Sequence, residues 1–153
     1  DEPTMIIMFG DHSPKLPDAF ETWIAGDAYQ NLSVEDQEKF YGTPFFIWTN
    51  YDIEERQDVV ISPNYLGVLT AQTAGLPLTG YMNFLAQMYQ ELPVITPVGL
   101  ITADGQTLTE SELNEEQQEW LWKYETFNYC GMIDLFDEAR PFFCPPQDRE
   151  QNG

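Results

Sequence analysis

Residues 5–12 read Met-Ile-Ile-Met-Phe-Gly-Asp-His, and this stretch decides how the rest of the chain is interpreted. Its five leading apolar residues predict a strand buried on both faces, as in open α/β sheets, where ligands bind at the carboxyl ends of strands. Asp11 and the chain's only histidine, His12, follow at that end. A carboxylate beside an imidazole suits a divalent metal such as Zn, Mn or Mg. A capping aspartate and a surface histidine in a Ser-Pro turn are the open alternative.

The motif Gly10-Asp11-His12-Ser13-Pro14 after an apolar strand resembles the Gly-Asp-His metal motif of the alkaline phosphatase/sulfatase superfamily. Further segments follow in an order similar to the carboxyl-terminal part of lipoteichoic acid synthase-like proteins. These segments are Thr43–Asn50, Ile61–Gly67, Ala74–Pro77, Leu92–Ile95, Trp120–Tyr124 and Phe127–Tyr129. The resemblance covers most of the chain, but residues 17–42 and the tail after Pro141 carry no recognisable pattern.

The resemblance implies an α/β fold: part of an alkaline phosphatase/sulfatase-like domain, with a small carboxyl-terminal antiparallel sheet and a long helix. It implies that Asp11 and His12 hold a divalent metal, with Mn favoured and Mg or Zn as alternatives, and we expect this metal not to be fully bound in the fragment. Lys15, three residues after His12, is either a phosphate contact near that metal or an inert surface lysine.

The activity implied by the resemblance is metal-dependent transfer of glycerol phosphate from phosphatidylglycerol head groups. Its threonine nucleophile would lie upstream of the first strand. We therefore expect this chain to be an inactive, soluble fragment of an enzyme anchored at the extracellular face of the cell membrane. A sulfatase or phosphoethanolamine transferase is an alternative, because the tripeptide is shared across the superfamily. A non-catalytic structural or interaction module is a second alternative.

The composition of the chain indicates a folded protein and argues against several functional classes. The 153 residues are 42% hydrophobic and 14% aromatic, which is enough to bury a core. A net charge of −20 argues against binding to nucleic acid or to anionic membranes. The sequence also lacks a Gly-rich phosphate loop, a Gly-x-Ser-x-Gly elbow and a Cys-x-x-Cys pair, so nucleotide hydrolysis, acyl transfer and thiol redox catalysis lack their usual motifs.

Two cysteines, Cys130 and Cys144, are expected to be structural. Their spacing fits no zinc pattern, and neither has a neighbouring histidine or basic cluster that would mark a nucleophile. They could be free thiols or could close a disulfide in an oxidising compartment.

Capping signals and periodicity predict an alternation of strands and helices. Strands are expected at Thr4–Gly10, Thr43–Thr49, Val59–Ile61, Val94–Thr102, with an edge or bend at Pro97, and Thr107–Leu108. Helices are expected at Asp18–Ala25, from Ser33 to near Gly42, at Asn64–Ala74 with Ser62 as cap, from Thr79 to Leu92, and from Thr109 to about Tyr129. Two apolar stripes are expected to face the core: Tyr81, Phe84, Leu85, Met88 and Leu92, then Leu113, Trp120, Leu121, Tyr124 and Phe127.

The change of character at Pro93 predicts two units. Residues 1–92 are expected to form the carboxyl-terminal part of the sulfatase-like core, suited to one edge of a larger parallel sheet, and residues 94–153 a small α+β subdomain with a frayed tail. Apolar strands at Thr4–Gly10 and Thr43–Thr49 would need covering elements that this chain lacks. The expected partners are therefore the missing amino-terminal part of the catalytic domain or a second copy, together with the lipid head-group substrate.

Overall fold

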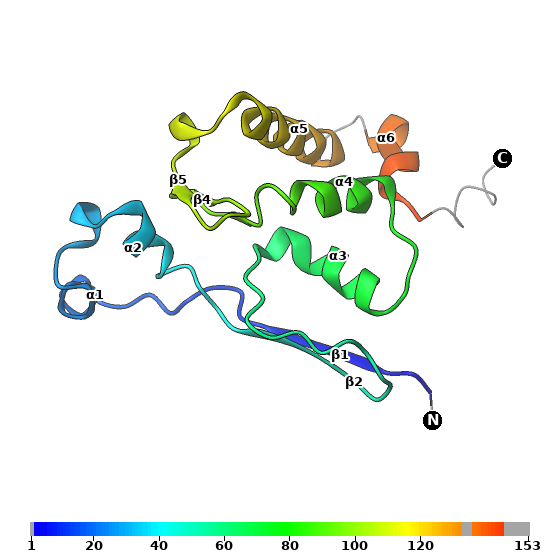
Figure 1. Cartoon of the computed structure of the whole chain (residues 1–153), viewed down its shortest axis with the longest axis horizontal. Coiled ribbons are helices and arrows are strands. Elements are labelled where there is room, and N and C mark those ends of the chain that lie inside the picture. The colour runs from blue at the N-terminus through cyan, green and yellow to red at the C-terminus, as the bar shows by residue number, and fades with distance from the viewer. Residues whose placement is uncertain (1, 133–135, 146–153) are drawn as a thin grey trace.

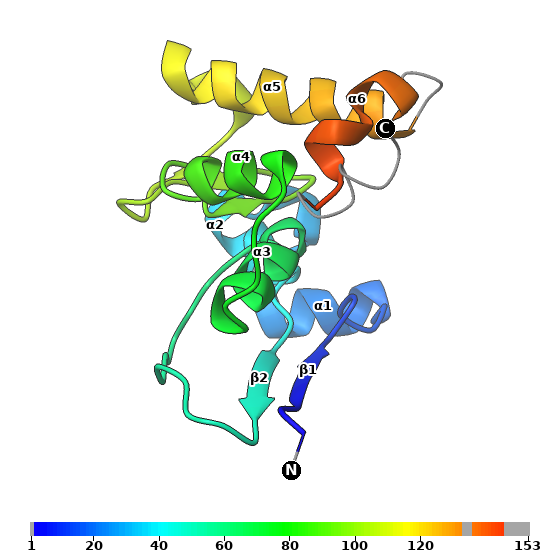
Figure 2. The same cartoon turned by 90° about the vertical axis from the view of Figure 1, so that its right-hand side faces the viewer.

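The computed structural model describes residues 2–132 and 136–145, and these form a mixed α/β fold with small antiparallel sheets and a long helix, as the sequence predicts. The strands are β1 (Met5–Phe9), β2 (Phe45–Thr49), β3 (Val94–Ile95), β4 (Leu100–Ile101) and β5 (Thr107–Leu108). The helices are α1 (Asp18–Ala25), α2 (Val34–Glu38), α3 (Pro63–Thr73), α4 (Gly80–Met88), α5 (Glu115–Met132) and α6 (Phe136–Phe143), with single turns η1 (Tyr29–Asn31) and η2 (Glu110–Glu112). In Figures 1 and 2, α3, α4 and α5 lie in successive layers beyond the β1–β2 ribbon.

The first two strands form an isolated antiparallel ribbon, with Ile7 opposite Ile47. The prediction that these strands are buried on both faces is wrong for the described chain, and their mutual pairing is not parallel. Their residues alternate between half-buried and exposed positions, except that Phe9 at the end of β1 is also exposed. The reason is that only two strands pair here, and one face of this ribbon is not covered by any other element of the described chain. That exposed face carries Ile6, Met8, Phe46 and Trp48.

Helix α3 begins and ends where its signals predict. Pro63 occupies the first helical position, and Gly75 follows the helix with a φ of 66°, a conformation that glycine adopts without strain. Ser62 stands at the cap position but makes no capping bond. Its Oγ instead accepts from the Ile95 backbone N–H at 2.5 Å and donates to the Ile95 carbonyl at 3.0 Å, which ties α3 to β3. The predicted strand at Val59–Ile61 is irregular backbone.

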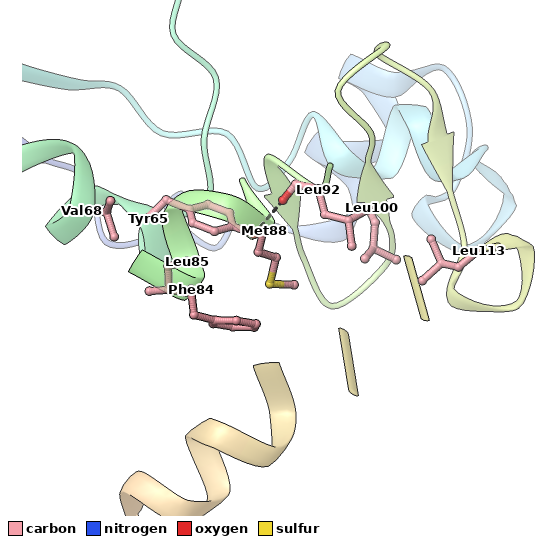
Figure 3. Close-up of a cluster of buried hydrophobic side chains, with 8 residues drawn as sticks. All are labelled: Tyr65, Val68, Phe84, Leu85, Met88, Leu92, Leu100 and Leu113. Atoms are coloured by element: carbon pink, nitrogen blue, oxygen red, sulfur yellow. Dashed lines mark hydrogen bonds between the residues drawn. The ribbon is translucent and has the colours of Figure 1, made fainter. Parts of the chain in front are cut away.

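Helix α4 supplies the centre of the core. Thr79 caps it as predicted, because its Oγ1 accepts from the Met82 N–H at 3.0 Å. Met88 and the following Leu92 have no exposed surface. Around them the buried cluster comprises Tyr65, Val68, Phe84, Leu85, Leu100 and Leu113 (Figure 3). This confirms the core-facing stripe expected from the sequence.

The segment after Pro93 forms the expected small antiparallel sheet, and the bend expected at Pro97 is a full turn that divides the predicted strand into two. Residues 96–99 turn the chain, so that β3 pairs with β4, and β4 then pairs with β5. The turn packs against α2. The Thr96 hydroxyl donates to the buried Glu38 carboxylate at 2.6 Å, and a Cβ on Gly99 would lie 2.6 Å from Val34. Only glycine fits that close approach, which the strand periodicity of the sequence did not reveal.

The long helix α5 begins later than predicted. Thr109 and Glu112 do form a capping box, but it closes only the single turn η2. A second reciprocal pair starts α5: the Gln117 N–H donates to Asn114 Oδ1 at 2.9 Å, and the Asn114 N–H donates to Gln117 Oε1 at 3.0 Å. Phe127 of α5 packs edge to face on Phe84, with ring centroids 4.8 Å apart.

Helix α6 was not predicted, because an eight-residue segment containing Pro141 lacks a clear helical signal. It packs on α4 and α5, and its Phe142 ring lies 4.8 Å from that of Phe127. Cys130 and Cys144 are free and partly buried. Most of the expected frayed tail, residues 146–153, lies outside the described residues. The division of the chain at residue 93 stays a prediction.

Candidate metal centre

The turn after β1 is fixed against the start of β2. The Gly10 N–H donates to the Pro44 carbonyl at 3.1 Å, and the Thr43 hydroxyl donates to the Gly10 carbonyl at 2.8 Å. A Cβ on residue 10 would lie 2.9 Å from the Thr43 Cβ, so a larger residue would push the two segments apart. Ser13 adds a hydroxyl bond to the Gly42 carbonyl at 3.3 Å. The backbone that carries Asp11 is therefore anchored on both sides.

The ring of His12 has a defined hydrogen-bonding arrangement. Its Nδ1 lies 2.9 Å from the Ser13 carbonyl oxygen, and since a carbonyl can only accept, Nδ1 carries the proton. In the neutral ring Nε2 then bears the free lone pair. Metal-binding histidines commonly have their second nitrogen fixed by such a bond.

The Asp11 and His12 side chains bring two potential ligand atoms close together. Asp11 Oδ1 accepts from the His12 backbone N–H at 3.0 Å, which leaves Oδ2 available, and Oδ2 lies 3.5 Å from His12 Nε2. Two ligand atoms on a tetrahedral ion with bonds of about 2.1 Å are about 3.4 Å apart. The pair therefore fits two positions on one ion, although the same contact suits a surface aspartate beside a histidine.

The pair is open to solvent and offers two potential ligand atoms. The Asp11 and His12 side chains are 80% and 77% exposed. Within residues 2–132 and 136–145, no three His, Cys, Asp or Glu side chains are grouped so as to hold a metal ion. A catalytic ion uses at least three protein ligands, so further ligands would have to come from outside the described residues.

Lys15 lies in the exposed turn between Pro14 and Pro17. It makes no ion pair with any residue that the structure describes, whereas Lys39, Arg56 and Lys123 each have an acidic partner. Its ammonium group is thus not engaged by an acidic side chain of the described residues. The roles of Lys15 and of the pair stay predictions.

One hollow of the described structure was not predicted from the sequence. A groove of about 820 Å³ lies between residues 52–61 and the helices α3 and α4, and Tyr65, Val68 and Tyr89 contribute to its lining. Arg56 in this groove is engaged by Glu54, whose Oε2 lies 2.8 Å from Nη2. No sequence signal could have revealed the groove, because its walls come from segments far apart along the chain.

Two of the tyrosines with raised pKa values, Tyr65 and Tyr81, belong to the core. Burial raises the pKa of Tyr65 above its usual range and the pKa of Tyr81 to about 12. The Tyr65 hydroxyl donates to the Leu92 carbonyl at 2.7 Å, and the Tyr81 hydroxyl donates to Asn128 Oδ1 at 2.6 Å. Both hydroxyls are structural donors that connect α3 and α4 to their neighbours.

Comparison with known proteins gives a distant relative. The chain is 27% identical over 113 residues to a Rhizobium meliloti (strain 1021) protein named "Putative cyclic beta-1,2-glucan modification protein". The match covers 72% of this chain but only 18% of that protein. No protein-family model and no solved structure matches the chain. Among the helices of the described residues, none is long and apolar enough to cross a membrane.

Proposed function

We propose that this chain forms the carboxyl-terminal part of a metal-dependent phosphoglycerol transferase that resembles lipoteichoic acid synthases and modifies a glucan. The observation that carries the proposal is the pairing of Asp11 Oδ2 with His12 Nε2 at 3.5 Å on an anchored turn. The name of the Rhizobium relative supports a glucan as acceptor, and favours this activity over hydrolysis of a sulfate ester.

In this proposal, Asp11 and His12 supply two ligands to a divalent metal, with Mn favoured and Mg or Zn as alternatives. When bound, such a metal stabilises negative charge on a phosphoryl oxygen. The Ser13 carbonyl keeps the His12 proton on Nδ1, so that Nε2 is the ligating atom. Lys15 would contact the phosphate of the head group. The family resemblance adds a threonine, outside this chain, whose hydroxyl would attack the phosphorus of phosphatidylglycerol and displace diacylglycerol. An acceptor hydroxyl would then take the glycerol phosphate and release the threonine.

The β1–β2 ribbon provides an argument that another polypeptide segment pairs with this chain. Two ladder bonds, Gly10 N–H to Pro44 and Asn50 N–H to Thr4, fix which residues face β2. The alternation of an antiparallel ladder then directs the backbone groups of Ile7 and its odd-numbered neighbours away from β2. In Figure 2 the chain leaving β2 runs on the β2 side, so the outer edge of β1 is open. An open apolar edge is a template for another strand.

We propose that this strand belongs to the remaining part of a longer, membrane-anchored protein with its catalytic domain at the extracellular face. A second copy of the chain is the alternative occupant. The net charge of −20 on each copy disfavours self-association at low salt. This supports the intramolecular arrangement, in which one polypeptide completes both the sheet and the metal site.

The test is transfer of radiolabelled glycerol phosphate from phosphatidylglycerol to cyclic β-1,2-glucan. The longer protein that carries this sequence should catalyse it in the presence of Mn²⁺, and the purified 153-residue chain should stay at background. Asp11→Ala should abolish transfer, while Asp18→Ala, an exposed aspartate of α1, should not. Release of sulfate from aryl sulfates without transfer would instead support the sulfatase alternative, and activity of the isolated chain would contradict an incomplete site.

A further inference from the structure

A second hollow lies on the outer surface, beside the amino-terminal half of α5. It measures about 640 Å³ and is shallow. Its lining includes Glu110 and Ser111 of η2, and Gln118, Leu121, Trp122 and Glu125 of α5. In both Figure 1 and Figure 2, α5 is the outermost layer of the molecule on this side, away from the β1–β2 ribbon. The hollow therefore belongs to neither the candidate metal centre nor the ribbon edge.

Of the two largely exposed aromatic residues of α5, Trp122 and Tyr129, Trp122 lines this hollow. Trp120 packs on Phe84 with ring centroids 5.5 Å apart, and Phe127 also packs on Phe84. Trp122 is 63% exposed and makes no ring contact with the residues that the structure describes. A single exposed apolar side chain is common on protein surfaces. This one, however, borders a hollow that also presents polar side chains.

The polar groups of the hollow are placed on the same side of the helix as the indole. Gln118, Trp122 and Glu125 follow one another at i, i+4 and i+7, which is one helical face. Gln118 Nε2 donates to the Leu113 carbonyl at 2.8 Å, and this leaves its Oε1 free to accept. The carboxylates of Glu110 and Glu125 have no hydrogen-bond partner within the described residues. The hollow thus combines one flat apolar surface with several acceptors.

We propose that this hollow binds a neutral glucan chain, with one glucose ring stacked on Trp122 and its hydroxyls donating to Glu110, Glu125 and the Gln118 amide oxygen. A pyranose ring has an apolar face that suits an indole and a rim of hydroxyl donors that suits carboxylates. This inference rests on the proposed function, and it adds a glucan-binding surface apart from the candidate metal centre.

The negative charge of the hollow favours neutral ligands over anionic ones. Two carboxylates face the hollow, and no lysine or arginine is among the described residues that line it. The nearby Lys123 is engaged by Glu119 at 2.7 Å and lies over the Trp120 ring. An anionic sugar, a phosphorylated ligand or an anionic lipid would therefore meet repulsion without compensation.

The experiment is isothermal titration of the purified chain with unsubstituted cyclic β-1,2-glucan in EDTA, so that no metal takes part. The wild-type chain should bind saturably. Trp122→Ala should weaken binding by about tenfold or more, since it removes the flat aromatic surface on which the sugar ring stacks. Trp122→Tyr should restore part of the affinity. The matched control is Trp23→Ala, because Trp23 of α1 is 77% exposed and lies outside the hollow.

An oligogalacturonate of similar length should not bind, because its carboxylates face Glu110 and Glu125. No saturable glucan binding by the wild type, or equal binding by Trp122→Ala, would overturn the inference. Unfolding curves of the variants check that each is folded. If glucan binds through Trp122 but the longer protein transfers no glycerol phosphate, then the proposed function fails while the glucan site stands. Transfer without binding at Trp122 would overturn the glucan site and leave the proposed function standing.

Discussion

The β1–β2 ribbon and the α3–α4–α5 layers are both built from strongly apolar segments, but the two regions differ in how far their apolar side chains are buried. In the ribbon, Met8 is 62% exposed and Phe46 51%, whereas Met88 at the end of α4 has no exposed surface. The difference is that α4 has described neighbours on both sides, α3 and α5, and the ribbon does not. An apolar run therefore indicates that other elements should pack on the segment. It does not indicate whether those elements belong to this chain.

The largest expected effect on the free energy of unfolding is found by comparing substitutions of two methionines. Met88→Ala should lower the free energy of unfolding by about 2–5 kcal/mol, because it leaves a cavity in a closely packed core. Met8→Ala, on the exposed face of the ribbon, should change it by less than about 0.5 kcal/mol. Urea unfolding monitored by circular dichroism measures both. Similar losses for the two variants would break the distinction between a covered and an uncovered region.

A smaller effect is expected at the hydroxyl that joins α3 to the end of α4. Tyr65→Phe removes the donor to the Leu92 carbonyl and leaves that buried oxygen unpaired, which should cost about 1–3 kcal/mol. Tyr129→Phe is the matched control, because Tyr129 is largely exposed. The same urea titration should show no change for the control. A neutral Tyr65→Phe would mean that the hydroxyl does not hold α3 to the end of α4 in solution.

The start of α4 offers a third comparison, at the edge of the core. Thr79→Ala removes the oxygen that accepts from the Met82 N–H and should destabilise by about 1 kcal/mol. Ser62→Ala should cost a comparable or larger amount for another reason, since the Ser62 hydroxyl holds β3 rather than capping α3. Hydrogen exchange separates the two: protection should fall at Met82 in the first variant and at Ile95 in the second.

The smallest effect is expected at the turn η2. Hydrogen bonds from the Thr109 side chain and backbone lower the pKa of Glu112 from its usual 4.5. A depressed folded-state pKa contributes stability above the unfolded-state value, and this contribution is lost as the pH falls through the folded-state value. The acid side of the stability curve should therefore be less steep below pH 4.5 in Glu112→Gln than in the wild type. Parallel curves would mean that the capping box does not persist in solution.

The sequence predicts those elements whose signals are local. Thr79 with its apolar stripe gives α4, Pro63 and Gly75 bound α3, and Thr107–Leu108 returns as a strand. What it cannot predict depends on distant partners. Ser62 has the sequence context of a helix cap, but in the structure its hydroxyl is bonded to the backbone of Ile95 instead. The sequence gives no sign that Gly99 is required, because the requirement comes from the close approach of Val34.

The candidate site divides in the same way. Asp11 and His12 can be picked out because they follow an apolar strand directly, and their neighbouring positions follow from sequence alone. The choice of Nε2 as the free nitrogen needs the Ser13 carbonyl, which only the structure supplies. The hollow at Trp122 combines η2 with α5, so periodicity along the helix could not reveal it.

The central claim, that Asp11 and His12 together bind a divalent metal, is most directly tested by proton NMR, because His12 is the chain's only histidine and its imidazole signals cannot be confused with others. Substoichiometric Mn²⁺ should broaden the His12 ring signals of the wild type selectively. In Asp11→Ala the same addition should leave them sharp, while Asp18→Ala should behave like the wild type. Sharp His12 signals in the wild type, or equal broadening in Asp11→Ala, would contradict the claim.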